Sequence, residues 1–200
     1  EGMQVVFGHQ LSKESPELIV TSSHATQYNL EMPFGRGLIL PDGKRFYMLQ
    51  PAQFPYFRAA LRAALSGEKT AMPQLAEKLN LKSIEPDTTT RVWLAAGNCL
   101  FGDVNYSDQS MAVTALSGYG CNQVVGYTVP SWYGEGGWGT LSMFVSNTTG
   151  TTLAEAWFLN NQFLLQKTKE VDEHLLKAEF NDDEITYRLQ MSINRSGAKL

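Results

Sequence analysis

The sequence predicts an α/β fold, a three-layer sandwich in which helices flank a mostly parallel β-sheet. Two observations support this prediction. Short apolar runs, typical of buried strands, alternate along the chain with segments of helical periodicity. The 200 residues are 43% hydrophobic, enough for one substantial core, and show neither an internal repeat nor a linker. We therefore expect a single domain over residues 1–200.

The first half of the chain carries strand, hairpin and helix signals in that order. Residues 17–23 form an apolar run that ends in small polar residues, which is typical of a buried strand. Residues 37–49 contain two apolar runs around Pro41-Asp42-Gly43-Lys44, whose residue types favour a hairpin turn. The spacing of apolar residues predicts a helix over 53–65, and a second, shorter helix is expected over 72–79.

The second half of the chain continues this alternation of strand and helix patterns. The expected elements are a buried strand over 91–97, a helix from an Asp108 cap to Leu116, a strand over 123–128, a Gly- and Trp-rich loop over 129–139, a helix over 152–169 and a half-exposed strand over 185–193.

Composition argues against several classes of function. A formal net charge of −4 with scattered basic residues argues against a nucleic-acid partner. No stretch approaches the ~18 apolar residues that a membrane span needs. His9 and His174 have no partner at metal-ligand spacing, so we expect neither a metal nor a cofactor. Two cysteines are too few for a disulfide scaffold.

Two residues with reactive side chains follow predicted buried strands. His24 stands just after the first of them and Cys99 just after the strand over 91–97. Alone, such a cysteine is more often an inert apolar side chain and such a histidine a hydrogen-bonded structural one. Together, at the carboxyl ends of two strands, they favour a nucleophile and its base, provided that the strands are neighbours in the sheet.

Three stretches carry a resemblance to a known family. Residues 92–99 read Val-Trp-Leu-Ala-Ala-Gly-Asn-Cys, residues 126–135 read Gly-Tyr-Thr-Val-Pro-Ser-Trp-Tyr-Gly-Glu, and residues 18–26 end in Thr-Ser-Ser-His-Ala-Thr. In this order they resemble the catalytic subdomain of the gingipains, bacterial cysteine peptidases of the caspase-like clan. The similarity covers about residues 17–140, in patches.

The resemblance implies a thiol protease, that is, a hydrolase that cleaves peptide bonds within a chain. It makes Cys99 the nucleophile that forms an acyl-enzyme and His24 the group that carries the proton to the leaving amine. The backbone N–H groups of Ala25 and Cys99 would line the oxyanion hole. The wall of the pocket for the side chain before the cut bond would come from residues 130–135, with Ser131, Trp132, Tyr133 and Glu135 as the candidates.

The resemblance also implies a caspase-like sheet with further strands before the histidine strand, which only 16 residues precede here. We therefore expect this chain to be the C-terminal part of a larger domain or protein. Its expected partners are a peptide or protein substrate and the remaining N-terminal segment of the same precursor. The family resemblance favours a secreted or periplasmic bacterial protein.

Two alternatives stay open at this point. Ala25, Leu100 and Gly136 stand where the gingipain pattern has other residues, which fits a catalytically inactive, caspase-like binding module. The chain opens abruptly with Glu1-Gly2-Met3-Gln4, which fits a peptidase that acts only in self-processing.

Overall fold

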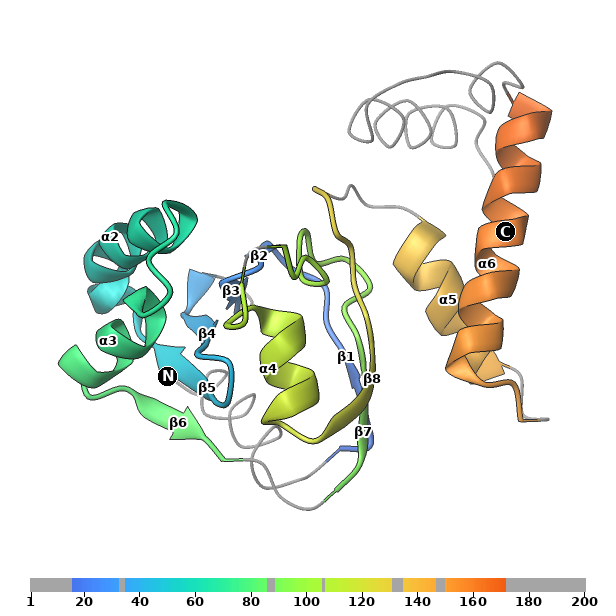
Figure 1. Ribbon diagram of the computed structural model, residues 1–200. Helices are drawn as coiled ribbons and strands as arrows, with labels where there is room; N and C mark the ends of the chain where they lie inside the picture. Colours follow the sequence, from blue (N-terminus) through green and yellow to red (C-terminus); the bar gives the residue numbers. More distant parts are fainter. Residues whose placement is uncertain are drawn as a thin grey trace. The chain divides into compact units, whose positions relative to one another are not determined.

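The computed structural model describes residues 16–32, 35–85, 89–105, 107–130, 135–146 and 150–171, with the side chains of 135–137, 168 and 171 left out. The chain divides into two compact units, Glu1–Thr128 and Val129–Leu200. All the described strands lie in the first unit, and the second unit contributes two helices (Figure 1).

The first unit contains a three-stranded parallel sheet. Its strands are β1 (Leu18–Val20), β7 (Arg91–Leu94) and β8 (Cys121–Val125), in the order β1-β7-β8. Both pairings are parallel, with Val20 opposite Leu94 and Leu94 opposite Val125. The predicted strands over 17–23 and 91–97 are therefore confirmed as neighbours, and the predicted strand over 123–128 begins at Cys121.

The segment between β1 and β7 forms a second sheet, which is antiparallel throughout. Its strands follow chain order: β2 (Ala25–Thr26), β3 (Asn29–Glu31), β4 (Leu38–Pro41), β5 (Phe46–Leu49) and β6 (Lys82–Ile84). The expected hairpin around Pro41-Asp42-Gly43-Lys44 is confirmed: the Asp42 carboxylate accepts hydrogen bonds from the backbone N–H groups of Lys44 and Arg45.

This second sheet changes the predicted architecture. We expected one mostly parallel sheet, whereas five of the eight strands in the described ranges belong to the antiparallel sheet. Short connections are the physical reason, since only an antiparallel partner can follow a turn of two residues such as Gln27-Tyr28. The broader prediction, a mixed α/β fold, holds.

The helices of the first unit agree well with their predicted positions. A 3₁₀ turn, η2 (Pro51–Gln53), leads into α2 (Phe54–Leu65), and α3 (Ala71–Lys78) follows. The helix α4 (Met111–Ser117) joins β7 to β8. Its cap differs from our expectation, because the Ser110 hydroxyl, and not Asp108, accepts the hydrogen bond from Val113 N–H.

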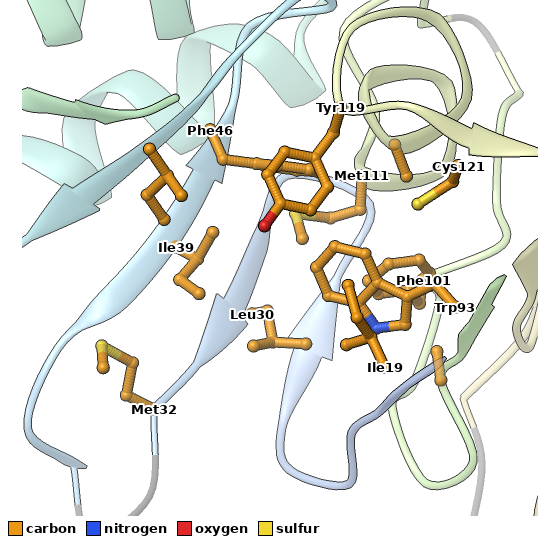
Figure 2. Close-up of a cluster of buried hydrophobic side chains, with 13 residues drawn as sticks. Ile19, Leu30, Met32, Ile39, Phe46, Trp93, Phe101, Met111, Tyr119 and Cys121 are labelled. Carbon is orange, nitrogen blue, oxygen red and sulfur yellow. The ribbon is translucent and has the colours of Figure 1, made fainter. Parts of the chain in front are cut away.

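One buried cluster joins both sheets and α4. The Trp93 indole of β7 is fully buried and lies 5.6 Å from the Phe46 ring of β5 and 5.1 Å from the Phe101 ring, measured between ring centroids (Figure 2). Ile19 of β1 and Met111 of α4 belong to the same cluster. Burying large aromatic side chains in such contacts contributes strongly to stability, so this core holds the parallel sheet against the antiparallel one.

The antiparallel sheet is covered on its other face by α2 and α3. Side chains alternate along β4 accordingly: Ile39 faces the Trp93 cluster, while Leu38 and Leu40 join a second cluster with Phe57 and Leu75 of the two helices. The sheet is therefore buried on both faces, and Figure 1 shows the two helices beside it.

The second unit consists of α5 (Glu135–Ser146) and α6 (Leu153–Val171) in the described residues. The helix predicted over 152–169 is confirmed, but the loop expected over 129–139 is wrong from residue 135 onward. Glycine usually weakens a helix, yet a Cβ at Gly139 would overlap with the Asn160 side chain of α6. This glycine therefore allows close approach of the two helices, which a count of glycines does not reveal.

Two further expectations concern the end of the chain and membrane spans. The strand predicted over 185–193 lies outside the described residues. None of the helices in the described ranges has the length and apolar character needed to cross a membrane.

The contact between α4 and the β4–β5 turn gives a test of this fold. A Cβ at Gly118, the residue after α4, would overlap with the backbone carbonyl of Lys44. We expect Gly118→Ala to lower the free energy of unfolding by about 1–3 kcal/mol in urea, because overpacking displaces the backbone. Leu116→Ala, on the exposed face of α4, should change it by less than about 0.5 kcal/mol. Equal midpoints for the two variants would contradict this contact.

Candidate functional site

The residues after the three parallel strands meet at one edge of the sheet. We call this edge the carboxyl edge and define it by residues 21–24, 95–102 and 126–128. Because β1 and β7 are hydrogen-bonded neighbours, their ends lie about 5 Å apart. Backbone hydrogen bonds continue past the strands, from Thr21 N–H to the Leu94 carbonyl and from Ala95 N–H to the Val125 carbonyl.

The loops that follow β1 and β7 are joined through the side chain of Asn98. Its amide nitrogen donates to the Ser23 carbonyl at 2.9 Å and to the Ser23 hydroxyl at 3.1 Å. Its amide oxygen accepts a hydrogen bond from the Thr21 hydroxyl at 2.6 Å. The Thr21 oxygen accepts in turn from the Trp93 indole N–H at 3.0 Å, so the network reaches the main core.

Two glycines allow close contact between these loops. A Cβ at Gly97 would overlap with the Ser22 hydroxyl, so glycine lets the loops after β1 and β7 approach one another. Gly102 lies against the backbone of Gly126, and its N–H donates to the Tyr127 carbonyl at 2.9 Å. All three loops of the carboxyl edge are therefore in contact.

His24 lies between β1 and β2, directly after Ser23, and its side chain is exposed to solvent. Its backbone carbonyl accepts a hydrogen bond from Glu31 N–H at 2.8 Å, which places Glu31 of β3 across from it. Antiparallel ladders alternate between bonded and non-bonded pairs. The next pair, Ala25 and Leu30, is therefore a non-bonded one, and the N–H of Ala25 points away from β3.

Cys99 follows Asn98 in the turn after β7 and is half-buried. It is a thiol and forms no disulfide with Cys121. The residue after it, Leu100, has φ of 55°, a left-handed conformation that is uncommon for a residue with a side chain. The turn therefore reverses sharply right after the cysteine.

The structure brings part of the predicted site together. His24 and Cys99 both lie on the carboxyl edge, each one residue away from the Asn98–Ser23 hydrogen bonds. Ala25 begins β2, two residues from Ser23. The expected pocket residues Ser131, Trp132 and Tyr133 lie outside the described residues, and Glu135 is the first residue of α5, with its side chain not described.

Two residues of this edge were missed by the sequence analysis. Thr21 and Asn98 are buried polar side chains that bond to each other across the two loops. A sequence signal existed, since a small polar residue directly follows each apolar run, but their partners lie far apart in the chain. Within the described residues, no three His, Cys, Asp or Glu side chains gather as metal ligands would.

Comparison with protein-family models, with curated proteins and with solved structures gave no match for this chain.

The two cysteines differ enough in environment to be tested by alkylation. Cys121 is 3% exposed, and burial raises the pKa of its thiol to about 11, against a smaller lowering by the Arg91 guanidinium. At pH 8 we expect iodoacetamide to modify one thiol, Cys99, in the folded protein and two thiols after unfolding. Mass spectrometry counts the labels. In the folded state, Cys121→Ser should carry one label and Cys99→Ala none. Rapid labelling of Cys121 in the folded protein would contradict the burial.

Proposed function

We propose that this chain carries the catalytic site of a cysteine endopeptidase, with Cys99 as nucleophile and His24 as its base. One observation carries the proposal: β1 and β7 are adjacent parallel strands, and their ends bear the imidazole and the thiol at one edge of the sheet. The resemblance to gingipains in residues 18–26, 92–99 and 126–135 supports the same assignment.

The proposed reaction has two steps. His24 accepts the thiol proton while Cys99 Sγ attacks the carbonyl carbon of the scissile bond. The C–N bond breaks, the imidazolium gives its proton to the leaving amine, and a thioester remains on Cys99. Water, deprotonated by His24, then attacks the thioester, releasing the acid product and restoring the thiol.

The oxyanion of the tetrahedral intermediate needs hydrogen-bond donors that are in place before the reaction. We assign this role to the backbone N–H groups of Ala25 and Cys99. The direction of the Ala25 N–H, away from β3, supports its part of the assignment. Alanine in place of glycine at this position leaves the N–H donor intact.

The finer fold assignment belongs to the same proposal. We propose that β1, β7 and β8 form part of a caspase-like sheet. The parallel pair β7 and β8, joined through α4, supports it as a strand–helix–strand unit.

The test is cleavage of a mixed peptide library by the full chain, with products identified by mass spectrometry. Because Cys99 supplies the reacting sulfur, Cys99→Ala should reduce cleavage by at least about 10³-fold. Cys121→Ala is the matched control and should keep the parent activity, since that thiol lies in the core. Thermal unfolding should differ little between Cys99→Ala and the parent.

Two outcomes would overturn the proposal: cleavage that persists in Cys99→Ala, or no cleavage by the parent chain together with equal thiol reactivity in the presence and absence of His24.

The role of His24 is tested separately from turnover. If the imidazole accepts the thiol proton, His24→Ala should slow alkylation of Cys99 by iodoacetamide at pH 6–7 by about tenfold or more. Glu31→Gln is the control: it removes a negative charge in β3, across from His24, and leaves the imidazole and the thiol in place. It should alter the alkylation rate much less than His24→Ala. An alkylation rate that is unchanged in His24→Ala would remove the histidine from the mechanism.

A further inference from the structure

We propose that Asn98 is a positioning residue, whose side-chain amide fixes the His24 loop against the Cys99 loop in the geometry that proton transfer requires. This inference rests on the proposed function, but it concerns a residue that contacts neither the substrate nor the reacting atoms. Its role is to act through the two loops that it joins.

The location of Asn98 is the first argument. It is fully buried, lies directly before Cys99 in the chain, and bonds to Ser23, which lies directly before His24. Through these bonds the Asn98 side chain joins the loop that carries Cys99 to the loop that carries His24. A shift of this amide therefore moves both reacting groups relative to each other.

The hydrogen-bonding capacity of the amide is the second argument. Both amide N–H groups are used, one on the Ser23 carbonyl and one on the Ser23 hydroxyl, and the amide oxygen accepts from Thr21. Aspartate would lack both donors, and leucine would lack every polar contact while keeping a similar shape. Asparagine is the residue that matches two acceptors on one side and a donor on the other.

The connection to the core is the third argument. The Thr21 hydroxyl donates to Asn98 and accepts from the Trp93 indole N–H. Trp93 is held among Phe46, Phe101 and Tyr119. The amide is therefore connected to the buried aromatic core of the unit, and its hydrogen bonds help to determine where Ser23 lies relative to that core.

A misplacement of about 1 Å between reacting groups can cost about 10²-fold in rate. Loss of the amide should therefore lower kcat, with little change in KM, because substrate contacts are not removed. It should also slow alkylation of Cys99 at pH 6–7, because the imidazole no longer lies where it accepts the thiol proton.

The main variant is Asn98→Leu, which removes the hydrogen bonds without adding charge. We expect kcat to fall by about 10-fold to 10²-fold, and alkylation at pH 6–7 to slow towards the rate of His24→Ala. Gly118→Ala is the control for lost stability. Gly118 lies between the end of α4 and the start of β8, and so at the opposite end of the parallel strands from the carboxyl edge. Measured well below its unfolding temperature, that variant should keep both rates.

A second pair of variants keeps the inference testable if Asn98→Leu does not fold. Thr21→Val keeps the shape of the side chain and removes the hydroxyl that bonds to Asn98, whereas Thr21→Ser keeps the hydroxyl and removes a methyl group. A positioning role predicts that Thr21→Ser retains more kcat than Thr21→Val. A packing role at this buried position predicts the reverse order.

The failure of this inference is distinguishable from failure of the proposed function. If the parent chain cleaves peptides and Cys99→Ala does not, the peptidase assignment holds. Full kcat and unchanged alkylation in Asn98→Leu, or Thr21→Val equal to Thr21→Ser, would then overturn the positioning role alone. A similar loss of kcat in Gly118→Ala, measured under the same conditions, would also overturn it, because the loss would then follow from lowered stability.

Discussion

The parallel pairing of β1 with β7 is the constraint on which the rest of the first unit depends. These strands are separated by most of that unit's sequence, so their pairing closes a long loop at an entropic cost. Burial offsets this cost, because Ile19 of β1 and Trp93 of β7 enter one core. The same pairing brings Thr21 beside Leu94 and sets the register in which Asn98 can reach Ser23. The contacts between the loop after β1 and the loop after β7 follow from it.

The segment between β1 and β7 forms its own local structure, and the pairing of these two strands determines where that segment lies. Short turns allow β2 to β5 to pair with their neighbours in sequence, and α2 and α3 cover one face of the resulting sheet. The helix α4 is hydrogen-bonded to two turns of this sheet. Met111 N–H donates to the Gln27 carbonyl in the β2–β3 turn, and the Thr114 hydroxyl accepts from Gly43 N–H in the β4–β5 turn. The first of these bonds holds the hairpin that begins at Ala25. The candidate base and oxyanion donor are therefore supported from the strand side and from the helix side.

The sequence was sufficient where a residue pattern acts locally or repeats. The apolar runs at 18–20 and 91–94, the hairpin at 38–49 and the periodicity of α2 are all readable without a partner, and a shared edge for His24 and Cys99 follows from strand topology. The sequence pattern failed where contacts with residues distant in the chain determine the structure. Strands β2 and β3 are two and three residues long, too short for an alternation to show. The glycines of α5 favour a loop in the sequence, and only the structure shows that Gly139 lies against Asn160 of α6. The role of Asn98 and Thr21 becomes visible only when the structure shows the hydrogen bond between them.

The polar network at the carboxyl edge poses a physical question, because stability alone does not require it. A satisfied buried hydrogen bond contributes only about 1 kcal/mol net, and apolar side chains of the same shape can serve nearly as well. Hydrogen bonds are more directional than apolar contacts. The bonds that link Trp93, Thr21, Asn98 and Ser23 therefore restrict how the two loops lie relative to one another. An apolar contact there would tolerate small slides of one loop past the other. Proton transfer between a thiol and an imidazole does not tolerate such slides, since it requires hydrogen-bond distance. The network thus supplies a restriction on position, which the proposed chemistry at this edge needs and folding does not.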